Sequence, residues 1–121
     1  MRLWLQEHES EYDRFDYNVR IGPGRDPGPD YSPAIREMGR KHSQLRIDAV
    51  AWKGNRPTLI ELKNFALMNA IAQIGLYAAV WREDYPTLPA PGLLIVCSGA
   101  EPGLVNAAVA ANVAVQILLP H

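Results

Sequence analysis

The stretch RIDAVAWKGNRPTLIELK, residues 46–63, decides the fold of this chain. Two apolar runs, 45–52 and 58–63, flank the segment KGNRP, in which Gly54 and Asn55 form a turn pair. Such a pair between two runs of strand-forming residues is typical of an antiparallel β-hairpin, here with a slightly long loop. We therefore expect two neighbouring strands at the centre of the protein.

The residues before the hairpin predict a strand, an irregular loop and a short basic helix. The run 14–21 alternates and is rich in β-forming residues, so it reads as a strand. Residues 22–33 hold three Gly and four Pro, a composition that excludes a regular element. A serine–proline pair at the end of this loop is typical of a helix start, and we expect a helix over 33–42. Residues 3–8 predict either a short helix or an extended arm.

The residues after the hairpin predict a helix, a strand, a helix and a strand. The longest helix is expected over 67–83, the strands over 93–97 and 113–119, and an alanine-rich helix over 102–111. The apolar residues that recur at helical spacing in the longest helix, and so mark its buried face, are Leu67, Ile71, Ile74, Ala78 and Trp81. A strand, helix and strand in this order form a parallel pair. The fold class is therefore α/β, with a mixed central sheet covered by helices, in a single domain.

Three charged residues interrupt the apolar strands of the hairpin. Side chains two apart on a strand share a face, so Glu61 and Lys63 project together, and the register can bring Asp48 beside Glu61. A carboxylate in such surroundings costs free energy unless it is paired or binds a metal. One interpretation is a buried salt bridge, Asp48 with Lys63 or Glu61 with Arg46. The other is a divalent-metal site.

The metal interpretation assigns a role to each of these residues. Mg²⁺ prefers oxygen ligands, so Asp48, Glu61 and the backbone carbonyl of Leu62 are candidate ligands. Lys63 can polarise or deprotonate the attacking water, or neutralise charge that develops on a phosphate. A lysine near a metal cation has a lowered pKa, which makes the base role physically feasible.

A polar stripe on the long helix follows the candidate site in the sequence. Gln73 and Tyr77 are four residues apart and lie on one helical face with Asn69. Gln73 could orient Glu61 or a metal-bound water, and Tyr77 could hydrogen-bond a phosphate or a catalytic group. The alternative is that this stripe is only the solvent-facing edge of a buried helix.

Positive charge gathers around the candidate site although the net charge of the chain is −1. Residues 33–63 carry a balance of +4, against −3 for residues 1–32 and −2 for residues 64–121. This distribution fits a phosphate-facing patch, and a solvated helix face beside a hairpin is the plainer interpretation. The candidate nucleic-acid-binding residues are Arg36, Arg40, Lys41, Arg46, Lys53 and Arg56.

Composition excludes several other classes of protein. The single cysteine, Cys97, excludes a disulfide framework and a cysteine-based zinc site within one chain. The sequence shows no secretory signal and no apolar stretch long enough to cross a membrane, so the cytoplasm is expected.

The residues Asp48, Glu61-Leu62-Lys63 and Gln73-x3-Tyr77, in the order strand, strand, helix, resemble the PD-(D/E)XK nuclease superfamily, and the trailing Gln and Tyr resemble its RecB-like branch. The resemblance implies a restriction-endonuclease-like αβββαβ core, here with a C-terminal helix and strand and with an insertion at about 22–43. It also implies hydrolysis of DNA with Mg²⁺ or Mn²⁺. Many members of the superfamily add a glutamate from the first helix to the metal site, for which Glu7 or Glu37 is the candidate.

Three functions compete on this reading. The first is a metal-dependent DNA endonuclease or DNA-processing nuclease of a bacterium or phage-infected host, which works as a homodimer or within a larger nucleoprotein assembly. The second is a non-catalytic nuclease-fold protein in phage DNA packaging, virion assembly or scaffolding, which the near-neutral charge favours. The third is a small-molecule or nucleotide-binding α/β domain, which has the least support because no glycine-rich phosphate loop follows a strand.

Overall fold

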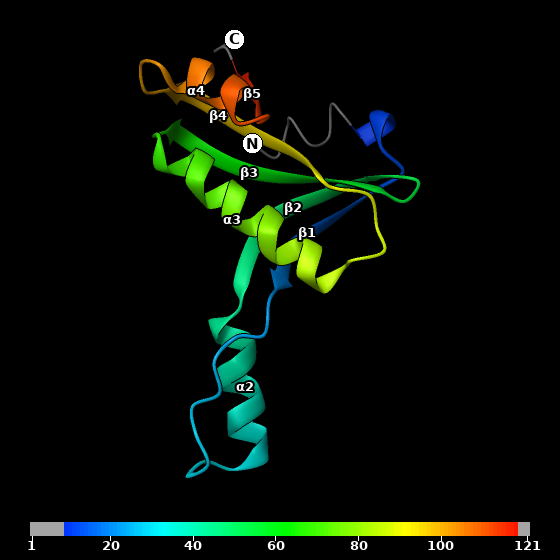
Figure 1. The fold of residues 1–121 in the computed structure, drawn as a ribbon, viewed down its shortest axis with the longest axis vertical. Helices are drawn as coiled ribbons and strands as arrows, with labels where there is room; N and C mark the ends of the chain where they lie inside the picture. The colour runs from blue at the N-terminus through cyan, green and yellow to red at the C-terminus, as the bar shows by residue number, and fades with distance from the viewer. Residues whose placement is uncertain (1–8, 119–121) are drawn as a thin grey trace.

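The structure, a computed structural model, describes residues 9–118, and its centre is a five-stranded sheet in the order β1-β2-β3-β4-β5 (Figure 1). The first two pairings are antiparallel and the last two are parallel, so the sheet is mixed, as the sequence predicted. The strands are β1 (Arg14–Ile21), β2 (Leu45–Lys53), β3 (Arg56–Ala66), β4 (Gly92–Ala100) and β5 (Ala114–Ile117). The predicted helix or arm at 3–8 lies outside the described residues.

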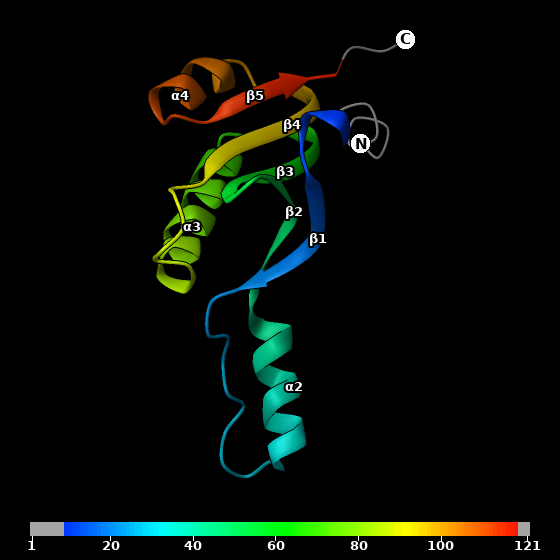
Figure 2. The same cartoon turned by 90° about the vertical axis from the view of Figure 1, so that its right-hand side faces the viewer.

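One long helix covers a face of the sheet, and a shorter helix stands apart from it. α3 (Asn69–Asp84) lies across the sheet, whereas α2 (Pro33–Ser43) projects away from the ends of β1 and β2 (Figure 2). α4 (Leu104–Ala110) connects β4 to β5, and a short 3-10 helix, η1 (Glu9–Glu11), precedes β1. Within residues 9–118, no helix has the length and apolar character needed to cross a membrane.

The hairpin of β2 and β3 has a tighter turn than its sequence predicted. Lys53 pairs with Arg56, so the turn consists of the two residues between them, and Gly54 adopts the positive φ of 59° that such turns require. Pro57 lies within β3, opposite Trp52. The prediction of a slightly long loop was therefore wrong. Arg56 and Pro57 belong to β3, because proline is tolerated near the start of a strand, where its missing N–H is not needed.

The buried face of α3 differs in part from the predicted one. Its buried side chains are Ala70, Ile74, Tyr77, Ala78 and Trp81. Ile71 is only partly buried, and Leu67 lies before the helix with 50% of its surface exposed, so the prediction for Leu67 was wrong. Helical spacing predicted a buried face that is too long at its N-terminal end, because Leu67 lies in the connection between β3 and α3.

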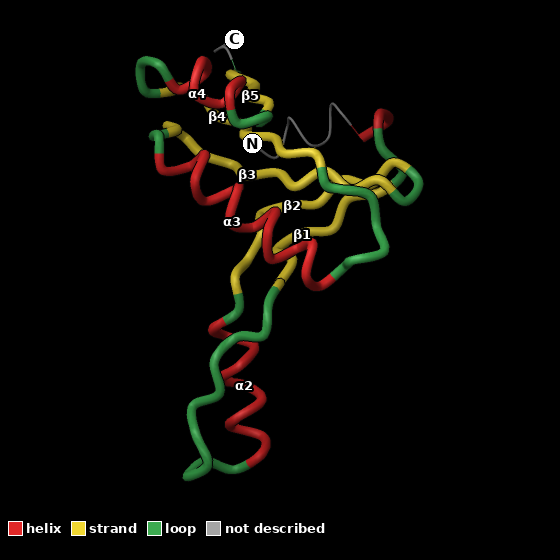
Figure 3. Tube along the Cα trace, in the orientation of Figure 1, coloured by secondary structure: helices red, strands yellow, loops and turns green. Residues whose placement is uncertain are grey.

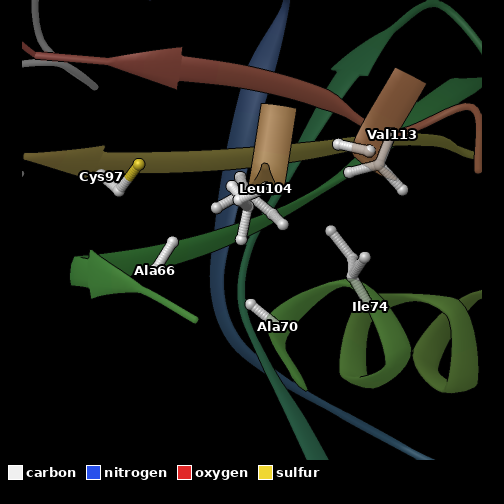
Figure 4. Packing of buried hydrophobic residues seen from close by; sticks show 8 residues of the cluster. Ala66, Ala70, Ile74, Cys97, Leu104 and Val113 are labelled. Carbon is white, nitrogen blue, oxygen red and sulfur yellow. The ribbon is translucent and has the colours of Figure 1, made fainter. Parts of the chain in front are cut away.

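The parallel half of the sheet carries its own part of the core. Side chains from β3, α3, β4 and α4 meet there in one apolar cluster, which fixes the start of α3 against the sheet (Figure 4). The cluster consists of Ala66, Ala70, Ile74, Ile95, Cys97, Leu104, Ala108 and Val113.

The sheet divides next to Asp48. Pairing between β2 and β3 ends where Ala49 lies opposite Ile60. The earlier residues of β2 then pair with β1, whereas the later residues of β3 pair with β4. The two strands therefore diverge, and their traces separate toward α2 and toward the start of α3 (Figure 3). This point of divergence, with Asp48 on β2 and Glu61 on β3, is called the fork below.

Candidate active site

At the fork, the side chain of Asp48 replaces the backbone hydrogen-bond acceptor that β3 no longer receives from β2. The Leu62 N–H donates a hydrogen bond to Asp48 Oδ2 at 2.8 Å, which holds the carboxylate between the diverging strands. The N–H and C=O of one strand residue point to the same edge of the strand. The carbonyl of Leu62 therefore also points into the fork.

Glu61 is the one buried acidic side chain among the described residues, with 4% of its surface exposed. Its Oε2 has no hydrogen-bond donor within the described part of the chain. The pKa of Glu61 is raised to about 7, chiefly by burial and then by the negative charge of Asp48, while Lys63 opposes the shift. Two carboxylates thus converge in an environment that disfavours their charge.

The ion pair in the site differs from both salt bridges that the sequence allowed. Lys63 Nζ lies 3.5 Å from Oε1 of Glu61, so the lysine pairs with its own strand neighbour. Among the described residues no ion pair joins Asp48 to Lys63 or Glu61 to Arg46. The second oxygen of Glu61 remains unpaired, so a salt bridge alone does not account for the buried carboxylate.

The polar stripe of α3 turns toward the sheet at Tyr77. Only 6% of Tyr77 is exposed, and Gln73 Nε2 donates to its hydroxyl oxygen at 2.8 Å. Burial raises the pKa of Tyr77, and the charges of Glu61 and Asp48 raise it as well, because the phenol lies close to both carboxylates. Since Gln73 occupies an acceptor position of the hydroxyl, the Tyr77 proton stays available for donation.

The donor set at the fork suits a hard divalent cation. Asp48, Glu61 and the Leu62 carbonyl offer only oxygen, and the unpartnered Oε2 is the kind of buried acceptor that a cation satisfies. Among the described residues, no three or more His, Cys, Asp or Glu side chains gather into one group. Two carboxylates and a carbonyl are enough for Mg²⁺, which retains several waters.

The structure separates the other predicted residues from the fork. Glu37 lies on α2, exposed, with its Oε2 2.7 Å from Arg40, and Glu7 lies outside the described residues. Arg36 pairs with Asp26, which lowers the pKa of that carboxyl to about 2 chiefly through its hydrogen bond to Arg36.

The basic residues are also divided among three places. Lys53 and Arg56 flank the turn of the hairpin, whereas Arg36, Arg40 and Lys41 lie on α2. Arg46 lies on β2 and is exposed. The predicted basic residues therefore do not form one continuous patch around the site.

Asn18 is a residue of the site region that sequence reasoning missed. Its neighbours Tyr17 and Val19 pair with Ala49 and Ile47, so Asn18 lies across from Asp48, and it adopts a left-handed conformation with φ of 51°. Ile47 and Val50 contact the same apolar cluster under α3, although residues three apart on a regular strand point to opposite faces. The antiparallel pair of β1 and β2 therefore bends at Asn18 and Asp48. Asparagine tolerates the left-handed region, and that is the only signal in the sequence.

Comparison with known proteins supports the fold and does not assign residues. No family model matches the chain, and no curated protein matches it. The crystal structure of a repair endonuclease from Pyrococcus abyssi superposes with a TM-score of 0.61 at 16% identity, over 99% of this chain and 45% of that one. EndoMS in complex with double-stranded DNA gives 0.57 at 14% identity, over 100% of this chain and 44% of that one. AF1548, a protein of unknown function, gives 0.60 at 13% identity, over 93% and 53%.

The chain thus spans less than half the length of the two repair nucleases that it resembles. The likeness extends over the whole sheet and its helices, and the predicted αβββαβ order of the strands and helices that lie within the described residues is confirmed. The protein has the restriction-endonuclease-like fold of these repair nucleases.

Proposed function

We propose that this chain is a divalent-metal-dependent nuclease that hydrolyses DNA phosphodiester bonds. One observation carries the proposal: the buried carboxylate of Glu61 lies in the fork beside Asp48, and its Oε2 has no donor within residues 9–118. The likeness in fold to a repair endonuclease, and to EndoMS in its complex with double-stranded DNA, supports DNA as the partner.

Asp48, Glu61 and the Leu62 carbonyl would hold Mg²⁺ or Mn²⁺. An ion in this place supplies Lewis acidity to a phosphate oxygen and lowers the pKa of a water. The protein's own contribution is to hold two carboxylates close together although their mutual repulsion and burial disfavour it. The hydrogen bond from the Leu62 N–H keeps Asp48 in place before any ligand arrives.

Lys63, Tyr77 and Gln73 would act on the reacting atoms or on the groups that touch them. Nζ of Lys63, 3.5 Å from Glu61 Oε1, would orient an attacking water. As the neutral amine it would accept a proton from that water, and the ammonium formed in this way would offset the negative charge of the transition state. The Tyr77 hydroxyl can donate to a phosphate oxygen or to Glu61. Gln73 is a positioning residue, because its amide fixes the orientation of the Tyr77 hydroxyl.

Finer assignments are part of the same proposal. The spacing of Gln73 and Tyr77 after Lys63 favours the RecB-like branch. We also propose a single nuclease-like domain over 1–121 from a bacterium or phage, active in the cytoplasm as a homodimer or as a subunit of a larger assembly.

A non-catalytic role on the same fold is the second candidate function. It would place the protein in DNA packaging, virion assembly or a scaffold. The observation that favours it is the net charge of −1, because a strong DNA binder usually carries a larger excess of Lys and Arg.

A plasmid-nicking assay with Mg²⁺ or Mn²⁺ separates the two candidates. Lys63→Met should lower the nicking rate by roughly a hundredfold or more, because it removes the proton-transfer and charge-stabilising group. Arg82→Met, an exposed change at the far end of α3, is the control and should keep the wild-type rate. Equal rates for Lys63→Met and wild type would contradict the catalytic assignment, and absence of nicking by folded wild type would favour the second candidate.

A further inference from the structure

The segment between β1 and β2, residues 22–44, forms a braced arm and not a loose loop. Asp26 accepts hydrogen bonds from the Gly28 N–H and from Arg36, which ties the Gly/Pro-rich loop to α2. Gly39 lies so close to Pro27 that a Cβ at this position would come within 2.8 Å of the proline ring. The arm, as residues 22–44 are called from here, is therefore ordered by its own contacts (Figure 1).

The outward face of the arm is apolar. Tyr31, Ile35 and Met38 have 51%, 48% and 58% of their surface exposed. Ile35 and Met38 are three residues apart on α2 and so are neighbours on its surface, and Tyr31 directly precedes the N-cap Ser32. A braced element that presents three large apolar side chains to solvent marks an interaction surface.

The charges of the arm and its base identify the chemistry of the partner. Residues 20–46 carry six of the twelve basic residues of the chain and three of its thirteen acidic residues. Two of these three acidic side chains form ion pairs within the arm, Asp26 with Arg36 and Glu37 with Arg40. Within the described residues no ion pair joins a carboxylate to the remaining basic side chains, which are Arg20, Arg25, Lys41 and Arg46. The surface therefore complements an anionic partner.

The arm is connected to the fork by only a few residues of β2. Gln44 ends the arm as the C-cap of α2, and Asp48 follows four residues later on β2. A helix of 11 residues is ~16 Å long, which corresponds to about five base pairs of B-form DNA. A double helix that presents a phosphodiester at the fork can therefore continue along the arm. A mononucleotide held at the fork is too small to reach it.

We infer that the arm binds the duplex that flanks the scissile bond, with Arg25 and Lys41 on phosphates and with Ile35 and Met38 against sugars and base edges in a groove. Apolar side chains make such groove contacts, and basic side chains supply most of the affinity. The inference rests on the proposed function and specifies its substrate class as double-stranded DNA.

The test compares two double variants in two assays. Ile35→Ser/Met38→Ser removes the apolar face of the arm, and Val105→Ser/Val109→Ser removes two exposed valines from α4, at the opposite end of the molecule. Fluorescence anisotropy with a labelled duplex of about 20 base pairs measures binding. Hydrolysis of bis(p-nitrophenyl) phosphate in Mn²⁺ measures the chemistry of the fork without the arm.

The arm variant should bind the duplex about tenfold more weakly, while the α4 variant should bind like wild type. Both should hydrolyse the small diester at the wild-type rate. Lys41→Ala should reduce the slope of log affinity against log salt by about one.

Unchanged duplex affinity in the arm variant would overturn the inference. It would be overturned equally if wild type sediments as a dimer, the arm variant sediments as a monomer, and both bind duplex alike, because the face would then join two copies. Failure of the proposed function has a different signature, in which wild type hydrolyses neither the small diester nor plasmid DNA, whereas the binding comparison still decides the role of the arm.

Discussion

At the scale of single residues, the protein without metal is destabilised by the very carboxylate that its chemistry requires. Glu61 is buried beside Asp48, and one weakly placed lysine partner leaves Oε2 unsatisfied. Its pKa is raised from 4.5 to about 7, with burial as the main cause. The folded protein therefore binds this proton more tightly than the unfolded chain does. Stability falls as the pH rises from the unfolded pKa through the folded one.

Glu61→Gln should stabilise the metal-free protein at high pH and not at low pH. Ionisation of Glu61 at high pH lowers the free energy of unfolding by up to about 3 kcal/mol, which is the size of this pKa shift. The neutral amide of glutamine does not ionise, so we expect the variant to be more stable than wild type by roughly 1–3 kcal/mol near pH 8 and about equally stable near pH 5. Urea unfolding in EDTA at the two pH values measures it. Glu37→Gln, on the exposed face of α2, is the matched control and should behave alike at both. A loss of stability at both pH values in Glu61→Gln would show that the carboxylate is well compensated.

Part of this site could be predicted from single residues and part could not. Asp48, Glu61 and Lys63 are visible in the sequence because each interrupts an apolar strand. The burial of Tyr77 was not predicted, because helical spacing does not say which polar residue turns toward a neighbouring charge.

At the scale of elements, the bend of β1 and β2 opens the fork. Asn18 in its left-handed conformation lies across from Asp48, and the pairing of β2 with β3 extends only as far as Ala49, the residue next to Asp48. Without the bend, β2 would continue beside β3, and Asp48 would lose its bond to the Leu62 N–H. Backbone strain at such a place is typical of functional sites.

Changing Asn18 should affect both stability and metal affinity, according to how well the new residue tolerates a positive φ. Asn18→Val should cost roughly 1–2 kcal/mol and weaken Mn²⁺ binding, whereas Asn18→Gly should keep both, since glycine adopts this conformation readily. Tyr17→Val is the control, an exposed change on the same strand at an extended position. Denaturant unfolding and Mn²⁺ titration check the series. Equal metal affinity in Asn18→Val and Asn18→Gly would refute the positioning role.

The elements themselves were largely predictable, and their ends were not. The strand 14–21 and the helix start at Ser32 follow from local patterns, and Ser32 does cap α2 through the Ile35 N–H. β3 runs on to Ala66 because β4 pairs with it in parallel, a long-range contact that no local pattern contains.

At the scale of the whole molecule, the fork joins two parts with different roles. The parallel half, with α3 and α4, forms the core that fixes Glu61 and Lys63, and the antiparallel half carries Asp48 and the arm. The sequence predicted an insertion at 22–43 and its basic helix. Its direction could not be predicted, because it depends on where β1 and β2 leave the sheet.

The measurement that tests the account most directly is a calorimetric titration of Mn²⁺ into wild type, Asp48→Asn, Glu61→Gln and Lys63→Met. We predict that wild type binds Mn²⁺, that affinity falls at least about tenfold in the two carboxylate variants, and that Lys63→Met retains binding. Wild-type affinity should also rise as the pH increases through about 7, because Glu61 must lose its proton to bind a cation. Equal affinity in all four proteins, or no binding by folded wild type, would contradict a metal site at the fork.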